Sequence, residues 1–277
     1  MKKLILTTAI SLVLTACGSS GNSSISSQSN QLNFAEKEGV AVSEYFFGVS
    51  TQSHTHKKGI NKLYLIGELG EYKGKEIIIP LIPEGALSNN HFHYLDIKLG
   101  NAITKSIISS RYYQYTRFGL LRDPEDKDFL TFFQGVETKV NDLPKGTGIQ
   151  YRGDALGIVR IERHNLKNPK DNLNDIESGW VEGKSEFTVD FSHKKISGVL
   201  KDFKVGENGL NVPTMIISAK SFSGNKVDYL NENTAKGTGE LLKAQFYGSK
   251  AAELSGQYVK RLDKEKVIFA VFGAKKQ

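Results

Sequence analysis

The sequence is poor in cysteine and proline. Cys17 is the single cysteine among 277 residues. An intrachain disulfide is therefore excluded, and packing alone must stabilise the folded part of the chain. Proline occurs 6 times, whereas glycine occurs 27 times, alongside 15 Phe and 11 Tyr. Few prolines combined with many glycines and aromatic residues favour β-hairpins over a helical bundle.

Recognised catalytic motifs are also absent. The sequence contains no G-x-S-x-G or H-E-x-x-H motif and no G-K-[ST] phosphate loop. The formal net charge of +7 is modest, and no stripe of Lys and Arg with interleaved aromatic residues accompanies it. We therefore predict that the chain is not an enzyme, has no metal site and no obligatory cofactor, and does not bind nucleic acid.

The first 16 residues have the pattern of a secretory signal. Lys2 and Lys3 precede an apolar run from Leu4 to Leu14, which is too short to cross a bilayer as a stable helix. The run ends in Leu-Thr-Ala-Cys, the pattern of a bacterial lipobox. We therefore predict that residues 1–16 are removed and that Cys17 is acylated and becomes the new N-terminus.

Residues 17–31 are predicted to be a lipidated, flexible tether. They are rich in Ser, Gly and Asn and contain almost no apolar side chain, so they cannot bury enough surface to order themselves. Several acyl chains on Cys17 would hold the protein in a membrane. Gly18, in place of Asp, follows the cysteine, so the usual inner-membrane retention signal is missing. The expected location is the outer membrane, with the protein lipid-anchored and exposed at the surface.

Beyond residue 31 the chain alternates short β-type runs with turn signals. In "SEFTVDF" the apolar Phe187, Val189 and Phe191 alternate with polar residues, "SHKK" provides a turn, and "ISGVLKDF" returns. Such a series of antiparallel strands favours a closed barrel, which leaves no exposed edge. A change in pattern near Pro144 predicts a β-rich domain over residues 32–144 and a compact barrel over residues 145–277.

Two local features complete the expected fold. The Tyr-rich segment "RYYQYTRFGLL", residues 111–121, alternates like a strand. One helical turn is expected around residues 250–254.

Three segments of the barrel half resemble a known family. They are "LPKGTGIQYRGDA" (residues 143–155), "FYGSKAAELSGQYV" (residues 246–259) and "IFAVFGAKKQ" (residues 268–277). They are similar to the barrel entry and the terminal signature of transferrin-binding protein B, and the last four residues resemble the terminus of factor H-binding protein. In this signature we expect Gly248 and Gly256 to form turns and Phe246 and Leu254 to lie in the core.

The resemblance implies an all-β surface lipoprotein with an N-terminal β-sheet handle and a C-terminal eight-stranded antiparallel β-barrel. Members of these families capture host proteins, and some relatives bind haem. The length of this chain matches one handle–barrel lobe. We therefore expect it to bind a host serum protein, with complement factor H as the first expectation. The alternative is capture of haem, haemoglobin or transferrin for iron acquisition.

Two histidine pairs are candidate ligand-binding residues: His54 with His56, and His91 with His93. On a strand, both members of an H-x-H pair face the same side. Two such pairs brought together would be able to ligate a metal ion or haem iron. No flanking acid or cysteine completes a ligand set, so surface histidines are the simpler interpretation.

An aromatic cluster offers the other candidate contacts. Tyr112, Tyr113 and Tyr115 lie close in sequence to Phe118, Phe132 and Phe133. Tyrosine is favoured at protein interfaces, but paired strands also use aromatic residues for cross-strand packing. Core packing is favoured for the cluster as a whole, and the three tyrosines are retained as candidate ligand contacts.

Overall fold

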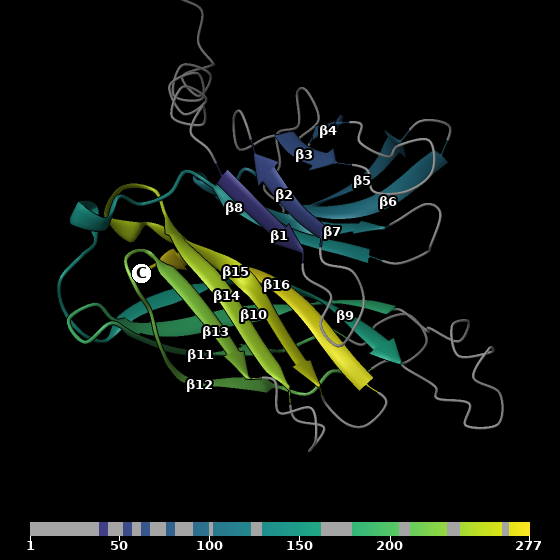
Figure 1. The fold of residues 1–277 in the computed structure, drawn as a ribbon. Helices are drawn as coiled ribbons and strands as arrows, with labels where there is room; N and C mark the ends of the chain where they lie inside the picture. The colour runs from purple at the N-terminus through teal and green to yellow at the C-terminus, as the bar shows by residue number, and fades with distance from the viewer. Residues whose placement is uncertain are drawn as a thin grey trace, which may run out of the picture.

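The computed structural model is almost entirely β-structure (Figure 1). It describes residues 39–43, 52–56, 62–66, 76–80, 91–99, 102–122, 129–161, 179–204, 211–231, 239–261 and 266–277. The predicted signal, Cys17 and the tether lie outside these residues. Within the described part of the chain, no helix is long and apolar enough to cross a membrane.

The N-terminal half contains a four-stranded antiparallel sheet, which we call the handle. Its strands follow one another in sequence and in space: β5 (Phe92–Leu99), β6 (Ala102–Ser109), β7 (Thr116–Arg122) and β8 (Phe129–Gly135). Two hairpins precede it in the chain: β1 (Gly39–Ser43) with β2 (Gln52–His56), and β3 (Lys62–Ile66) with β4 (Glu76–Pro80). In Figure 1 the handle lies above the C-terminal strands.

The C-terminal half is an eight-stranded antiparallel barrel. Its strands are β9 (Ile149–Ile161), β10 (Gly179–Asp190), β11 (Lys195–Lys201), β12 (Met215–Ser221), β13 (Lys226–Asn231), β14 (Glu240–Tyr247), β15 (Glu253–Arg261) and β16 (Lys266–Lys276). The first strand, β9, pairs with the last strand, β16, in a continuous register from Lys266↔Ile161 to Lys276↔Tyr151. The predicted eight-stranded antiparallel barrel is therefore confirmed.

The barrel is nearly closed. Strands β12 and β13 are joined by a turn at Ser223–Lys226 but are not paired as a ladder, and they form a seam. Lys220 on β12 fills the seam: its Nζ lies 3.6 Å above the Tyr229 ring of β13 and 3.3 Å from Glu240 of β14. The lysine is buried, so this ion pair replaces the hydration that its ammonium group loses.

The barrel interior is an apolar core rich in aromatic residues. Phe187 and Phe272 pack with ring centroids 4.6 Å apart, and Phe246 lies 5.0 Å from Phe191. Phe246 and Leu254 are fully buried, as expected from the terminal signature. The alternation of Phe187, Val189 and Phe191 therefore reflects a strand with one face in this core.

Two local expectations are wrong, and a third, the helical turn, is confirmed in part. Residues 111–115 form turns and bends, and β7 begins only at Thr116. The helical turn is a short 3-10 helix at Ser249–Ala251, because β15 already begins at Glu253. Gly256 lies inside β15, where a Cβ atom would meet Lys243 O at 2.3 Å, so it permits close approach of two strands. Gly248 does form a turn, with φ of 75°.

The segment between the last handle strand and the first barrel strand runs from residue 136 to residue 148, and Pro144 lies within it. It is tied to the barrel along the way. Thr138 N–H donates to Phe246 O at 2.9 Å, and the Thr138 hydroxyl donates to Gly248 O at 2.7 Å. The connection therefore adds hydrogen bonds between the two halves.

Candidate functional site

The handle packs on the outer face of barrel strands β15 and β16 through an apolar layer. Phe118 and Leu120 of β7 and Phe133 of β8 meet Ile158 of β9 and Val271 of β16 in one buried cluster. The Phe118 ring lies so close to β16 that a Cβ atom on Gly273 would come within 2.1 Å of it. The two halves are thus packed together as one lobe.

Asp154 of β9 is the polar centre of this interface. Its side chain is 2% exposed and accepts three hydrogen bonds: from Tyr113 OH at 2.7 Å, from Lys184 Nζ at 2.8 Å, and from His91 Nδ1 at 2.6 Å. Tyr113 and His91 come from the handle side, whereas Lys184 comes from β10. The buried carboxylate thereby joins both halves of the lobe, and its charge is balanced by Lys184.

Tyr113 is held rigidly by this arrangement. Its hydroxyl also accepts a hydrogen bond from the backbone N–H of Asp154 at 3.0 Å and lies 3.1 Å from Gly273 O. Burial, followed by the negative charge of Asp154, raises the pKa of Tyr113 well above its ordinary value. The phenol therefore stays neutral and acts as a structural hydrogen-bonding group.

Glu253, the acid of the terminal signature, makes a second polar connection. Its buried carboxylate accepts hydrogen bonds from the backbone N–H groups of Gln114 and Tyr115, at 2.7 and 2.9 Å. Burial raises the pKa of Glu253, while these two hydrogen bonds and the positive charge of Arg117 act in the opposite direction. The barrel thus captures the loop that precedes β7.

Arg117 completes the capture of this loop. Its guanidinium is buried and donates to the backbone carbonyls of Tyr113 and Thr116. Burial lowers the pKa of Arg117 to about 10, with the charge of Glu253 opposing the shift. Because side chains occupy these backbone groups, residues 111–115 cannot pair as a strand, which explains why the strand expected there does not form.

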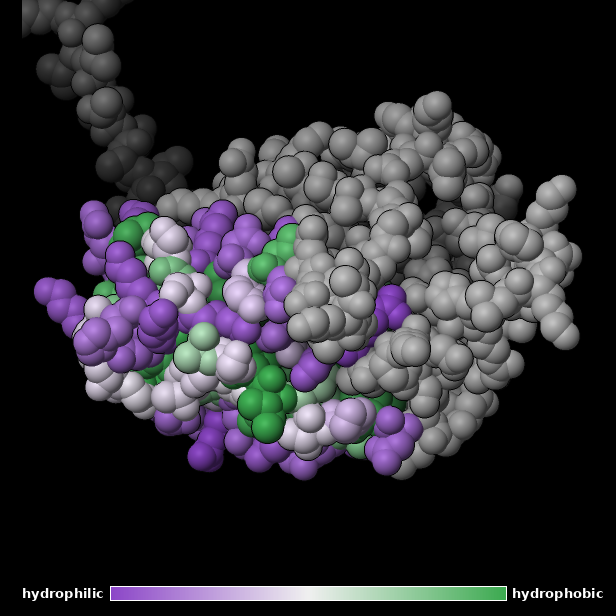
Figure 2. Space-filling view, turned by 60° about the horizontal axis from the view of Figure 1, so that its bottom comes forward, coloured by the Kyte–Doolittle hydropathy of each residue, from purple (hydrophilic) through white to green (hydrophobic). Residues whose placement is uncertain are grey.

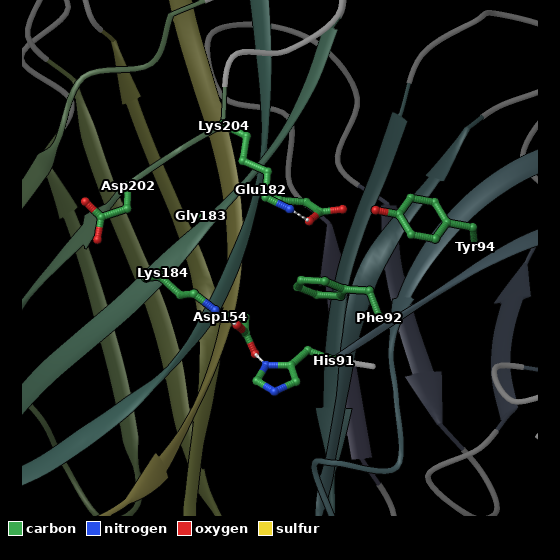
Figure 3. A pocket seen from close by; sticks show the side chains of 9 residues that line it. All are labelled: His91, Phe92, Tyr94, Asp154, Glu182, Gly183, Lys184, Asp202 and Lys204. Carbon is green, nitrogen blue, oxygen red and sulfur yellow. Dashed lines mark hydrogen bonds and ion pairs between the residues drawn. The ribbon is translucent and has the colours of Figure 1, made fainter. Parts of the chain in front are cut away.

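Beside Asp154 lies a cavity of about 420 Å³, which we call the cleft (Figure 3). Its lining residues are His91, Phe92, Tyr94, Asp154, Glu182, Gly183, Lys184, Asp202 and Lys204. Figure 3 shows Phe92 and Tyr94 on the handle side, facing the charged side chains of the barrel. Lys204 Nζ bonds Glu182 at 2.9 Å within this lining.

A partly exposed aromatic pair lies at the cleft. Tyr94 is 59% exposed and stacks edge-on against Trp180, with ring centroids 5.8 Å apart. Tyr94 shares the lining of the cleft with cationic and anionic side chains, among them Lys184 and Lys204. Aromatic anchors surrounded by polar groups are typical of protein–protein interfaces.

The two predicted histidine pairs lie in different parts of the molecule, so the structure does not show them brought together. His54 and His56 lie on β2 in a two-stranded sheet, and their side chains lie outside what the structure describes. His91 contacts Asp154 and stacks on Tyr112 at 4.2 Å, whereas His93 lies near Arg117 and Arg111. Burial, followed by the charges of Arg117 and Arg111, lowers the pKa of His93.

Metal or haem ligation by these histidines stays a prediction. Among the described residues, no group of three or more His, Cys, Asp and Glu side chains is arranged to hold a metal ion. His91 already uses its Nδ1 atom to bond Asp154, which leaves Nε2 as the nitrogen with which it would bind a ligand.

The predicted tyrosines fall into two groups. Tyr113 is fully buried and has no surface to offer a ligand, while Tyr115 is half-buried against the handle–barrel interface. Tyr112 is 39% exposed, with His91 stacked on its ring and Lys275 Nζ 4.5 Å from its centroid. Phe118, Phe132 and Phe133 are buried, so core packing accounts for most of the aromatic cluster.

Sequence patterns do not reveal the residues that organise the site. Asp154 and Glu253 lie within the quoted family segments. Their contacts with residues 113–115 span 41 or more positions in sequence and are visible only in the structure. Trp180 is the single tryptophan of the chain, and Tyr94 follows the second histidine pair directly. Their rarity and position are the signals that would have drawn attention to them.

Comparison with known families finds a match for the barrel. Residues 143–276 match the family of C-lobe and N-lobe beta barrels of Tf-binding protein B. Two transferrin-binding protein B sequences of Neisseria meningitidis are 28% and 31% identical over 53% and 59% of this chain. The chain spans only 23% and 28% of their lengths. An uncharacterized protein of Haemophilus influenzae is 27% identical over 92% of this chain and 93% of its own length.

Solved structures show the same fold. Transferrin-binding protein B of Neisseria meningitidis superposes with a TM-score of 0.59 at 22% identity, covering 86% of this chain and 43% of that chain. A variant of the protein from Haemophilus parasuis gives 0.57 at 22% identity, covering 86% and 45%. The shared fold includes the handle as well as the barrel.

The fold and site thus define a class of structure: a four-stranded β-sheet handle packed on an eight-stranded barrel. Within that class, the resemblance to single lobes of transferrin-binding protein B is confirmed, because residues 143–276 match that family of barrels and the fold superposes on a solved member.

Proposed function

We propose that this chain is a lipid-anchored surface protein that captures a host iron-carrier protein, with transferrin as the first candidate. The match of residues 143–276 to transferrin-binding protein B barrels carries the proposal. Transferrin has better support than factor H, because the matched relatives are named as transferrin-binding proteins. Capture needs no catalytic group, so the proposal includes no enzymatic activity.

The cleft supports a role in binding. Tyr94 offers an exposed aromatic surface, Trp180 lies against it, and ion pairs such as Lys204–Glu182 surround them. The cleft lies between two sheets that are fixed to each other through Asp154 and Glu253. A rigid site of this kind loses little entropy when a partner docks.

Capture is tested with the mature chain, immobilised through its N-terminal tether and exposed to human serum. Mass spectrometry of the retained proteins should identify transferrin, and purified iron-loaded and iron-free transferrin then establish the preferred form. Retention of factor H without any iron carrier would overturn the proposal. Haemoglobin and haemin serve as additional ligands, and a haemin spectrum that depends on His91 would favour the haem alternative.

Variants test whether the cleft is the contact surface. Tyr94→Ala and Trp180→Ala should each weaken capture by about tenfold or more, as expected for aromatic anchors. Ile216→Ala is the matched control, because Ile216 is 72% exposed on β12, away from the cleft. Equal affinities for all three variants would remove the cleft from the binding surface while leaving capture itself intact.

A further inference from the structure

One end of the barrel carries an excess of positive charge. This basal end consists of residues 136–152, 190–195, 221–226, 247–253 and 275–277, all of which the structure describes. It contains four acidic residues and nine cationic ones. The cationic residues are Lys139, Lys145, Arg152, Lys194, Lys195, Lys226, Lys250, Lys275 and Lys276. In Figure 1 this end carries the mark of the C-terminus, and Figure 2 shows mostly hydrophilic surface on that side.

Two of the four acidic residues of the basal end are buried or paired with a lysine. Glu253 is buried in its hydrogen bonds to the loop before β7. Glu137 pairs with Lys226 at 3.6 Å, and Asp190 bonds His193 at 2.8 Å. Within the described segments of this end, Asp142 and Asp190 are the remaining acids, against nine cationic residues. The surface that a partner meets is therefore strongly cationic.

Four lysines of this end point into solvent. Lys139, Lys145, Lys194 and Lys250 are exposed, and none of them forms an ion pair within the described part of the chain. Lys194 and Lys250 have φ angles of 52° and 51°, in the left-handed region that favours glycine. Lysine thus occupies two tight turns at a cost in backbone strain, which places its charge at the tips of the barrel.

The kind of cation identifies the partner. Eight of the nine cationic residues are lysines. Protein interfaces are enriched in arginine and depleted of lysine, whereas lysines near a surface are attracted to anionic lipid headgroups one by one. Val140, 58% exposed beside Lys139, adds an apolar side chain of the sort that enters the headgroup region.

We propose that the basal end of the barrel docks on an anionic membrane surface through the phosphate groups of its lipids. Docking would orient the lobe. Glu182 and Lys184 of the cleft lie on β10, several residues before its basal end at Asp190. At about 3.3 Å per residue, roughly 20 Å separates them from that end. The cleft would therefore begin beside the basal end, where Asp154 lies two residues from Arg152, and extend away from the membrane toward Glu182. The inference does not depend on which protein is captured.

The test uses the mature chain, residues 17–277, with Cys17→Ala so that no acyl chain contributes. We expect it to sediment with phosphatidylcholine vesicles that contain about 30% phosphatidylglycerol, and not with phosphatidylcholine alone. Raising the salt from roughly 0.1 M to 0.5 M should release it. Failure to bind the anionic vesicles, or equal binding to neutral ones, would overturn the proposal.

A matched pair of double variants separates the basal end from net charge. Lys194→Gln with Lys250→Gln should weaken vesicle binding by about tenfold or more. Lys105→Gln with Lys260→Gln removes the same charge from exposed or half-buried positions elsewhere and should change binding by about twofold or less. Equal losses for both pairs would overturn the proposal. Heparin binding that depends on Lys194 and Lys250, without vesicle binding, would also overturn it and reassign this end to a soluble polyanion.

Discussion

Tyr113 and Asp154 are joined by two hydrogen bonds that run in opposite directions. The phenol donates to the carboxylate at 2.7 Å, and the backbone N–H of Asp154 donates to the phenol oxygen at 3.0 Å. The two residues are 41 positions apart in sequence and belong to the handle side and the barrel. One buried hydroxyl therefore satisfies both a backbone group and a charged side chain.

Removal of this hydroxyl tests its contribution. Tyr113→Phe leaves the Asp154 N–H and one carboxylate interaction unpaired in a buried site, so we expect a loss of about 1–3 kcal/mol in the free energy of unfolding. Urea denaturation measures it. Tyr112→Phe is the control, because the Tyr112 ring is partly exposed and stacks without a buried hydroxyl bond. Equal stability of the two variants would contradict the assignment.

Glu253 predicts a specific pH dependence. Because burial raises its pKa above the ordinary value of 4.5, the folded state retains a proton that the unfolded state has released. This contribution to stability is therefore largest at low pH and is lost as the pH rises through the folded pKa. Glu253→Gln lacks it, so the stability of the native chain relative to the variant should fall as the pH rises from about 4.5.

The same variant has a second effect, which does not depend on pH. Each oxygen of Glu253 accepts one backbone N–H, from Gln114 or from Tyr115. In the variant an amide nitrogen replaces one of these oxygens and cannot accept, so we expect a loss of about 1–3 kcal/mol in the free energy of unfolding at every pH. Urea titrations between pH 4 and pH 8, about the range over which carboxyl groups titrate when buried, separate the two effects. A native chain that gains stability over the variant as the pH rises would contradict the predicted sign.

Gly273 tests the close approach of the handle. A Cβ atom there would lie 2.1 Å from the Phe118 ring, so Gly273→Ala must push the handle outward. We expect a loss of about 2–3 kcal/mol. Gly157→Ala is the matched control, because its Cβ would meet only side-chain atoms at 3.1 Å or more, and its effect should stay within about 1 kcal/mol. Thermal unfolding of both variants decides between them.

Lys220 tests the seam of the barrel. Lys220→Met keeps the length of the side chain but removes the ion pair with Glu240 and the contact with the Tyr229 ring. Hydrogen exchange should then become faster in β12 and β13 by about tenfold, while β9 and β16 keep their protection. Lys105→Met, at an exposed position of β6 outside the barrel, should leave all four strands unchanged.

Much of the fold was predictable because it depends on local patterning. Alternation in "SEFTVDF" located β10, and the burial of Phe187 and Val189 follows from it. The terminal signature identified the barrel type. The loop at residues 111–115 was not predictable from its alternating pattern. Glu253, which is distant in sequence, and the buried Arg117 bond its backbone groups, so these groups do not pair as a strand.

The site was less predictable than the fold. His91 was a candidate from its spacing, but its partner, Asp154, is 63 residues away. Tyr113 was a candidate ligand contact, yet burial makes it a structural residue. Pattern analysis recognises which residue types favour contacts, whereas burial decides which of them a partner is able to reach.

The pairing of β9 with β16 has a consequence for how the protein forms. β9 ends at Ile161 and β16 begins at Lys266, so the two strands that close the sheet are separated by on the order of 100 residues. During synthesis from the N-terminus, the backbone edge of β9 that will pair with β16 stays unpaired until β16 has been made. We expect folding to be slow and to finish with this strand, so that the unfinished chain needs protection from aggregation until β16 has paired.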